Sequence, residues 1–397
     1  MTSPHSSLLC SLLLLSAGLA ATASALPAQA PAAAAPVAPD QIDEFILREM
    51  ERQKVKGISI AIIEGGKVVK AQGYGFTDAT RQTPVTPATL FQAASSSKCF
   101  TAYAALRLAE QKQLSLDEDL NRHLTSWQIP ENDFTRTEKV TLRRILPHMA
   151  GFNIGGFYGY PRGEAFPTLL AVLDGKAPAK SAPIRVGSVP GTKTEYSGGG
   201  YCVLQQWVID VSGQPFADYM KQAIFEPLGM VHSTFECPLP AARWPEAAHG
   251  YGYALAGGQA NKELERAELP WQWNNFPESA PAGLWTTPSD LALFVMDIQR
   301  TKAGASSAVL SQEMVEKVLT RVPGCKWPLS LGNLVLEHPG EKNAEFRFSG
   351  TNAGFQCGSF GTVHSGQGCV IMYNDHLGEA FPTDFRNLVA KVYGWQK

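Results

Sequence analysis

The most informative stretch of this sequence reads Leu90-Phe91-Gln92-Ala93-Ala94-Ser95-Ser96-Ser97-Lys98. Helix-forming residues follow it, so we expect Ser95 at a helix N-terminus, where backbone N–H groups and the helix dipole favour negative charge. Lys98, three residues further on, lies on the same helical face. A serine hydroxyl becomes nucleophilic when a neighbouring base accepts its proton, and a partly buried lysine can be that base. Taken alone, however, the pair is better interpreted as an N-capping serine followed by a surface lysine.

Upstream of this stretch, the sequence predicts one helix and one hairpin. Asp40 precedes apolar residues at helical spacing, which indicates an amphipathic helix to about Gln53. The β-rich segments 58–63 and 68–74 flank Gly65-Gly66, a two-residue turn signal, and together they predict a β-hairpin.

Downstream, helical patterns fill the middle of the chain and strands return near its end. The β-rich segments 355–360 and 369–373 are separated by a glycine-containing turn and predict a second antiparallel pair. The helical patterns lie between Gly- and Pro-rich loops, at residues 102–111, 141–146, 201–211, 216–225 and 288–299.

These patterns predict an α/β (α+β) fold. Strands from both chain ends would form one antiparallel sheet flanked by helices, and the helices between them would form an inserted, mostly α-helical lobe. We expect residues 40–397 to form one domain, with an α/β lobe of about residues 40–112 and 245–397 and a helical lobe of about residues 113–244. A chain of 397 residues is long enough to bury such a core.

The composition excludes several classes of function. The chain has 34 Lys and Arg against 36 Asp and Glu, a formal net charge of -2 at pH 7, and no long run of basic residues. These features argue against a nucleic-acid partner and against a polybasic membrane patch. His and carboxylate residues show no metal-ligand spacing, so we expect neither a metal site nor a cofactor.

The first 39 residues predict export. An apolar run at residues 8–20 is followed by Ala23-Ser24-Ala25, which is typical of a signal peptide over residues 1–25. A membrane-spanning helix needs about 20 apolar residues, so we expect no stable membrane span in the mature form. Residues 26–39 interleave Pro with Ala and predict a disordered linker. The predicted location is the periplasm or the external medium.

Export to an oxidising compartment allows disulfides to persist. Apart from Cys10, which lies in the apolar run, the chain holds Cys99, Cys202, Cys237, Cys325, Cys357 and Cys369. Their wide scatter gives neither a small disulfide framework nor a C-x-x-C metal spacing. We therefore expect buried thiols, with one bridge or none.

A series of sequence blocks changes the interpretation of Ser95 and Lys98. Residues 90–98 are followed by Leu114-Ser115-Leu116-Asp117, residues 141–151 (TLRRILPHMAG), Pro190-Gly191, Tyr196-Ser197-Gly198, Pro227-Leu228-Gly229-Met230, residues 282–291 (AGLWTTPSDL) and residues 348–355 (FSGTNAGF). This series, in this order, resembles the serine β-lactamase and penicillin-recognising superfamily. The similarity is to the branch of class C β-lactamases, D-Ala-D-Ala carboxypeptidases and related esterases, and it extends from about Asp40 to Trp395.

The resemblance implies roles for individual residues. Ser95 matches the acylated serine of the family and Lys98 its partner base. Tyr196 matches the tyrosine that exchanges protons with the serine and the leaving group. A free phenol ionises near pH 10, so a nearby cation is needed, and Lys98 is the candidate. The family's oxyanion hole uses two backbone N–H groups, which here belong to Ser95 and Thr351.

Two departures from the family pattern bear on the substrate. Gly198 stands where a Tyr-x-Asn triplet has its asparagine, and Phe348-Ser349-Gly350 stands where many relatives have Lys-Thr-Gly. Phe348 cannot pair with a substrate carboxylate as lysine does. Because Arg347 would point away from Phe348 in an alternating strand, we do not expect it to replace that cation. We expect Gly198, Phe348, Ser349 and Gly350 to contact the substrate.

Aromatic residues suggest one wall of an acyl pocket. Trp285 is predicted to bind substrate, and Trp271, Trp273 and Phe276 fit either the pocket or ordinary packing. His148 precedes the Ala-Gly turn of its block, for which we expect a structural role.

The predicted function is that of an exported serine hydrolase that cleaves esters or amides through a Ser95 acyl-enzyme, with an esterase-like preference and no cofactor. The partner would be a small ester or amide, or a substrate derived from peptidoglycan. The nearest alternative is a D-Ala-D-Ala carboxypeptidase, a D-amino-acid peptidase or a weak β-lactamase. A different class of alternative is a non-catalytic module that binds peptidoglycan or senses it.

Overall fold

The computed structural model describes residues 40–252, 267–375 and 380–395. Asp40–Lys397 form one compact unit. The predicted signal peptide (residues 1–25) and linker (residues 26–39) lie outside the described residues. Among the helices that are described, none combines the length and the apolar character needed to cross a bilayer.

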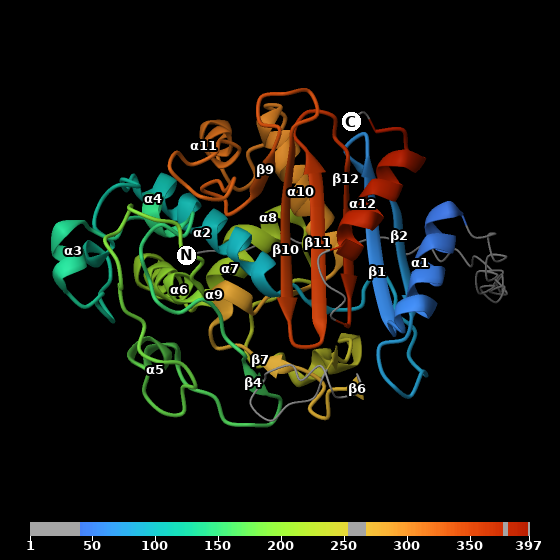
Figure 1. The fold of residues 1–397 in the computed structure, drawn as a ribbon, viewed down its shortest axis with the longest axis horizontal. Coiled ribbons are helices and arrows are strands. Elements are labelled where there is room, and N and C mark those ends of the chain that lie inside the picture. The colour runs from blue at the N-terminus through green and yellow to red at the C-terminus, as the bar shows by residue number, and fades with distance from the viewer. Residues whose placement is uncertain (1–39, 253–266, 376–379, 396–397) are drawn as a thin grey trace, which may run out of the picture. The chain divides into compact units, whose positions relative to one another are not determined.

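A six-stranded antiparallel sheet lies at the centre of this unit (Figure 1). Its strands lie in the order β2 (Lys67–Gly75), β1 (Gly57–Glu64), β12 (Gly368–Tyr373), β11 (Phe355–Thr362), β10 (Glu345–Asn352) and β9 (Val335–Glu337). Strand β1 pairs with β2 through the predicted hairpin and, on its other side, with β12 from the far end of the chain. The prediction of an antiparallel sheet built from both chain ends is confirmed.

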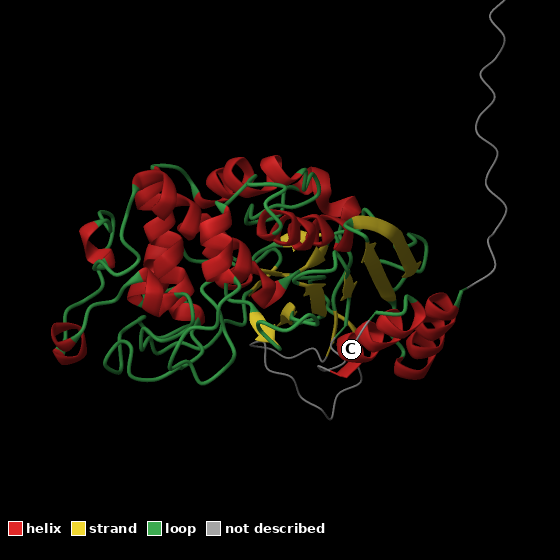
Figure 2. Ribbon diagram, turned by 90° about the horizontal axis from the view of Figure 1, so that it is seen from above, coloured by secondary structure: helices red, strands yellow, loops and turns green. Residues whose placement is uncertain are grey.

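Helices cover both faces of the sheet (Figure 2). Helix α10 (Pro288–Lys302) packs on one face, whereas α12 (Ala380–Val392) packs on the other and contacts α1 (Gln41–Gln53). Successive strand residues point to opposite faces. Ile60 of β1 therefore belongs to the core under α1 and α12, and Ala61 to the core under α10. Burial on both faces explains why β1 is mainly apolar, with Ser59 its one polar residue before Glu64.

Helix α2 (Ser97–Lys112) joins the sheet to the helical part of the chain. It contacts α6 (Gly198–Ser212) and α9 (Ser279–Ala282). On the sheet side, its Phe100 ring lies 4.3 Å from the ring of Phe294 in α10 and 6.4 Å from that of Phe348 in β10. A helix buried on nearly all sides needs apolar residues all round, as α2 has. The start of α2 is thereby fixed against β10.

The other described elements are short. The helices are α3 (Asp133–Thr137), α4 (Leu142–Ile145), α5 (Leu169–Asp174), α7 (Phe216–Met220), α8 (Glu226–Leu228) and α11 (Gln312–Val318), with the 3₁₀ turns η1 (Ala94–Ser96), η2 (Leu120–Arg122) and η4 (Ala241–Glu246) and the π-helical turn η3 (Lys221–Phe225). Short strand pairs are β3 (Phe91–Gln92) with β8 (Trp285–Thr286), β4 (Tyr160–Pro161) with β7 (Asn274–Asn275), and β5 (Tyr251–Gly252) with β6 (Ala267–Glu268).

The predicted elements are found close to their expected bounds. Asp40 caps α1 in a capping box with Asp43, and both predicted strand pairs form. The helix predicted at residues 216–225 is α7 continued by η3. Strand β9 and the three short strand pairs were not predicted from the sequence. The division into two lobes at residues 113 and 244 stays a prediction.

Candidate active site

Ser95 lies in the tight turn that precedes α2. Ala94, the residue before it, has a φ of 49°, a left-handed conformation that costs a side chain with a Cβ about 1 kcal/mol. The neighbouring hydroxyls hold this turn in place. Ser97 Oγ donates to the Ala94 carbonyl oxygen (2.6 Å) and accepts from the backbone N–H of Leu284 (3.0 Å). Ser95 is therefore presented on a strained turn that α2 and the chain beside it support.

Lys98 is buried one helical turn after Ser95, with 2% of its surface exposed. Its Nζ donates to Ser95 Oγ (3.2 Å) and to the carbonyl oxygen of Pro281 in α9 (2.8 Å). The ring of Tyr196 lies 4.8 Å from the same nitrogen, within the range of a cation–π contact. These contacts point the ammonium group at the serine.

Tyr196 also contacts the hydroxyl of Ser95. Its hydroxyl is hydrogen-bonded to Ser95 Oγ at 2.8 Å. Tyr196 directly precedes Ser197, whose side chain caps α6 by accepting from the N–H of Gly200 (2.9 Å). Lys98, three residues after Ser95, and Tyr196, 101 residues after it, thus both contact the Ser95 hydroxyl, as their assignment to the site requires.

His148 packs against the ring of Tyr196. Its ring centroid lies 4.4 Å from that of Tyr196, and its Nδ1 accepts from the backbone N–H of Ser197 (3.2 Å). Burial, with the charge of Lys98 adding to it, lowers the pKa of His148 to about 3. The ring is therefore neutral at physiological pH, and it contacts Tyr196 rather than Ser95, which agrees with the structural role expected for it.

Strand β10 carries the second expected oxyanion donor. A Cβ on Gly350 would lie 2.2 Å from the carbonyl oxygen of Ala93 and 2.5 Å from the backbone nitrogen of Ser95. Only glycine allows so close an approach. Asn352, at the end of β10, adds a hydrogen bond to Gln92 (2.9 Å). The strand is thus held against the serine turn, next to the backbone of Thr351.

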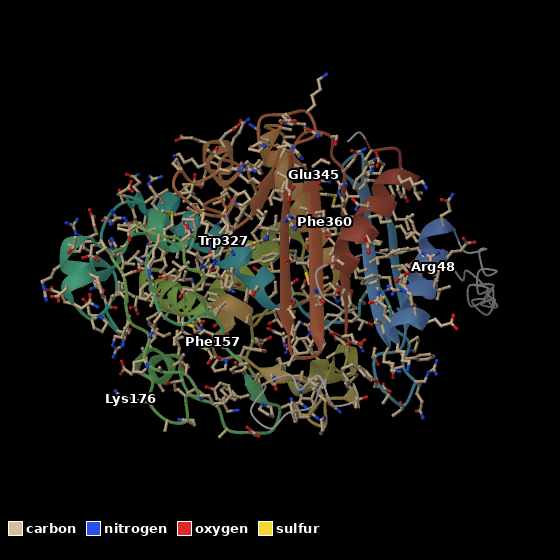
Figure 3. All side chains as sticks on the ribbon, viewed as in Figure 1. Arg48, Phe157, Lys176, Trp327, Glu345 and Phe360 are labelled. Atoms are coloured by element: carbon tan, nitrogen blue, oxygen red, sulfur yellow. The ribbon has the colours of Figure 1, made fainter. Side chains whose placement is uncertain are left out.

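A cavity of about 530 Å³ opens beside Ser95. Its outer wall is formed by Trp327, Pro328, Leu329 and Val335 from the chain between α11 and β10. Trp327 and Phe157 lie on the same side of β10, away from β11 (Figure 3). The complete lining is Ser95, Cys99, Tyr196, Trp327, Pro328, Leu329, Asn333, Val335, Arg347, Phe348, Ser349, Gly350 and Thr351. The cavity is therefore largely apolar, with polar groups near Ser95.

The five residues predicted to bind substrate divide into two groups. Ser349 and Gly350 border the cavity. Phe348 also borders it, but its ring is only 4% exposed and packs on Phe100 and Phe294, so it gives the cavity no apolar wall. Gly198 does not line the cavity.

Trp285 requires the clearest correction. It is buried in β8 and packs edge-on against Trp273 (5.5 Å) and Phe355 (5.7 Å), away from the cavity. Trp271 and Phe276 are also absent from the lining. The aromatic residues of this region therefore take part in packing and do not line the cavity. A Trp on a strand that is buried on both sides cannot reach the cavity.

Sequence reasoning missed the outer wall and one charged group. Trp327, Leu329 and Asn333 lie outside the sequence blocks that resemble the family. The one feature that could have pointed to them is a short apolar stretch in an otherwise polar loop. Arg347 alternates with Phe348 as expected, yet it lines the cavity and its Nε lies 3.0 Å from Glu337 Oε1. At the rim of the cavity, the charge of Arg347 is thus paired with that of Glu337.

Metal-ligating and thiol side chains are scattered through the described part of the chain. No group of three His, Cys, Asp or Glu side chains there is placed to hold a metal ion. All six described cysteines are free thiols, and Cys99, Cys202, Cys357 and Cys369 are buried. Burial raises the pKa of the Cys99 thiol far above its usual value, so this neighbour of Ser95 is not a reactive thiolate.

Known proteins resemble this chain in sequence. Residues 42–387 match the family described as Beta-lactamase. Protein flp from Staphylococcus aureus (strain N315) is 26% identical over 199 residues, covering 49% of this chain and 38% of that protein. A putative penicillin-binding protein, PbpX of Bacillus subtilis (strain 168), is 27% identical over 199 residues, covering 50% of this chain and 45% of its own. This chain thus spans less than half the length of each.

Solved structures share its fold. The octameric penicillin-binding protein homologue from Pyrococcus abyssi superposes with a TM-score of 0.68 at 25% identity, covering 89% of this chain and 77% of that one. FmtA from Staphylococcus aureus gives a TM-score of 0.66 at 18% identity, covering 89% of each chain. Because the family match covers most of the residues that build the sheet, α2 and α6, this chain belongs to the Beta-lactamase family.

Proposed function

We propose that the protein is a serine hydrolase that cleaves carboxylic esters through an acyl-enzyme on Ser95. One observation carries the proposal: Ser95 Oγ lies within hydrogen-bond distance of both Tyr196 Oη (2.8 Å) and Lys98 Nζ (3.2 Å). A nucleophile, a group that accepts its proton and a cation that supports that group are the parts that acyl transfer requires.

The reaction follows from this geometry. Ser95 Oγ attacks the ester carbonyl and passes its proton to Tyr196, whose ionised form the charge of Lys98 stabilises. The backbone N–H groups of Ser95 and Thr351 hold the negative oxygen of the tetrahedral intermediate. Tyr196 returns the proton to the departing alcohol. Water then enters, Tyr196 accepts one of its protons, and the second tetrahedral intermediate releases the acid and restores Ser95.

The preference for esters rests on the surroundings of the serine. The wall formed by Trp327, Pro328 and Leu329 is apolar, which suits an uncharged acyl chain or alcohol. The position that carries lysine in many relatives holds Phe348, which is packed in the core. Arg347, the cation at the rim, is paired with Glu337.

Hydrolysis of short p-nitrophenyl esters tests the proposal. We expect turnover by the full chain, stoichiometric labelling by a fluorophosphonate, and loss of both in Ser95→Ala with an unchanged circular dichroism spectrum. Ester turnover that survives in Ser95→Ala would exclude this serine as the nucleophile. Inertness of the wild-type protein towards esters and fluorophosphonates would favour a binding or sensory module.

A second candidate is a D-amino-acid peptidase or a weak β-lactamase, which Arg347 favours because a guanidinium at the cavity rim can pair with a substrate carboxylate. Long-lived, stoichiometric labelling by a fluorescent penicillin, reduced at least tenfold in Arg347→Ala, would support this candidate. Rapid ester turnover without penicillin labelling would support the esterase.

We also propose that the protein is exported. The support is the apolar run at residues 8–20 and the Ala23-Ser24-Ala25 sequence after it. N-terminal sequencing of the protein expressed from its full gene should give a start near Leu26. A protein that keeps Met1 and stays inside the cell would contradict export.

A further inference from the structure

The family's usual amide is absent from this site. Gly198 occupies its position, and a Cβ there would lie 3.1 Å from both the carbonyl oxygen of Gly155 and a ring carbon of Phe157. Both neighbours belong to the loop against which α6 begins. A side chain at residue 198 would fit only if these neighbours moved by a few tenths of an ångström. Because the residue is glycine, the cavity receives no amide from α6.

A different amide, that of Asn333, lines the cavity. Asn333 belongs to the turn before β9 and has a φ of 56°, a left-handed conformation that asparagine tolerates well. Ser330 closes the turn, because its carbonyl accepts from the N–H of Asn333 (3.1 Å) and its N–H donates to the carbonyl of Leu334 (3.0 Å). The thiol of Cys99 in α2 donates to the Asn333 carbonyl oxygen (3.5 Å). The backbone of Asn333 is thus tied to the helix that starts at the catalytic serine.

His148 defines which way this amide points. Its Nδ1 accepts the N–H of Ser197, so in the neutral ring the proton sits on Nε2. His148 Nε2 and Asn333 Oδ1 are both buried and neither closes a hydrogen bond in this structure. The two groups are neighbours, since Asn333 partly offsets the lowering of the His148 pKa. A buried donor next to a buried acceptor favours the orientation in which the amide oxygen faces His148.

The nitrogen end of Asn333 is then free for a ligand. Asn333 Nδ2 makes no hydrogen bond to any described residue, and the side chain borders the cavity that contains Ser95 and Tyr196. Few other donors lie along the wall formed by Trp327, Pro328 and Leu329. A polar group held in an apolar cavity discriminates strongly between substrates that can and cannot satisfy it.

We propose that Asn333 Nδ2 donates a hydrogen bond to a second carbonyl oxygen in the acyl part of the substrate, and that His148 is the residue that positions the amide. The preferred substrate class is therefore esters of N-acylated amino acids or of similar acids with an amide carbonyl a few bonds from the ester. This inference rests on the proposed ester hydrolysis and deepens it.

Two isosteric esters test the inference. The p-nitrophenyl esters of N-acetylglycine and of pentanoic acid have acyl chains of equal length, and only the first carries the second carbonyl. The readout is the ratio of their kcat/KM values, because comparing this ratio between variants cancels the difference in intrinsic reactivity. In Asn333→Asp, which keeps the shape and the left-handed backbone but removes the donor, we expect the ratio to fall about tenfold or more.

Three further variants complete the design. Asn333→Gly also keeps the backbone conformation and should lower the ratio by a similar factor if Asn333→Asp folds poorly. Asn343→Asp makes the same chemical change at a residue that lines a neighbouring cavity with Glu345 and should leave the ratio unchanged. His148→Asn should lower the ratio in the wild-type background but not in Asn333→Asp, because its effect on selectivity passes through Asn333.

The outcomes separate this inference from the proposed function. A wild-type protein that hydrolyses both esters, with a ratio that stays constant in Asn333→Asp and Asn333→Gly, overturns the role of Asn333 and leaves the hydrolase intact. A wild-type protein that hydrolyses neither ester overturns both. A His148→Asn effect that persists unchanged in the Asn333→Asp background shows that His148 acts by another route.

Discussion

At the scale of single residues, we propose that the hydroxyl of Tyr196 transfers protons to and from Ser95. It touches Ser95 Oγ, and its ring is held between the ammonium of Lys98 and the ring of His148. We expect Tyr196→Phe to lower kcat/KM for p-nitrophenyl esters by about 10²- to 10⁴-fold, since it removes the proton-transfer group and keeps the ring. Tyr158→Phe, on an exposed tyrosine nearby, is the matched control. Equal activity of the two variants would rule out proton transfer by Tyr196.

His148 makes the stability of the protein depend on pH. Its pKa is about 3 in the folded protein and 6.5 in an unfolded chain, so the unfolded state binds more protons between these values. The free energy of unfolding should therefore fall as the pH drops from about 6.5 towards 3, by about 1.4 kcal/mol per pH unit from this group. Urea unfolding of the wild type and His148→Asn at pH 8 and pH 5 checks this. Identical losses of stability in the two proteins would contradict it.

Sequence patterns located some residues of the site and misplaced others for a physical reason. Ser95, Lys98 and Tyr196 stand in blocks with fixed spacing, so their convergence could be expected before the structure was known. Trp285 also stands in a block, but the burial of its strand is decided by packing that no local pattern encodes. Asn333 and Trp327 lie in a loop whose course depends on β9, a strand of three residues.

At the scale of elements, the contact between β10 and the serine turn depends on Gly350. A methyl group there would meet the backbone of Ala93 and Ser95 at distances far below van der Waals contact, so β10 would have to move away. Because that strand carries Thr351, the second oxyanion donor that we propose, we expect Gly350→Ala to lower kcat by about 10²- to 10³-fold. Gly187→Ala, where a Cβ would meet its nearest neighbour at 3.9 Å, is the control. Full activity of Gly350→Ala would show that this strand takes no part in catalysis.

The start of α9 contains a buried carboxyl that weakens the fold at high pH. Burial raises the pKa of Glu278 to about 7, and its Oε2 has no hydrogen-bond partner. A raised folded pKa means that stability is lost as the pH rises from about 4.5 to 7. Glu278→Gln removes this loss and should be more stable than the wild type at pH 8 by about 2–3 kcal/mol, with little difference at pH 4.5. Equal unfolding midpoints in urea at both pH values would contradict the assignment.

Long elements could be predicted and short ones could not. The helix α1 and the hairpin of β1 and β2 carry caps, turns and periodic apolar residues, which are local signals. Strand pairs of two residues, such as β3 with β8, form because α2 and the sheet bring their backbones together. Such pairing is a consequence of the fold and leaves no period in the sequence.

At the scale of the whole molecule, the two chain ends stabilise one another through β1 and β12. Ile60 and Ile371 are cross-strand partners, and both are fully buried. Each substitution by alanine should lower the free energy of unfolding by about 2–5 kcal/mol. A double-mutant cycle should show a coupling of about 0.5–3 kcal/mol, measured by urea unfolding. Strict additivity would mean that the two strands do not share a core.

The overall arrangement was predictable in outline because strands at both ends and helices between them restrict the possible sheets. The layer of helices on each face is consistent with the mainly apolar sequence of β1, whose residues on both faces are buried. The sequence constrained the order of β12, β11 and β10 less. That order depends on which edge of the sheet lies next to α2.

The six free thiols have a practical consequence. Because no covalent cross-link joins any of these cysteines, the described fold rests on non-covalent contacts. We therefore expect the protein to keep its folded state when it is purified, stored and assayed in dithiothreitol, or produced in a reducing cytoplasm.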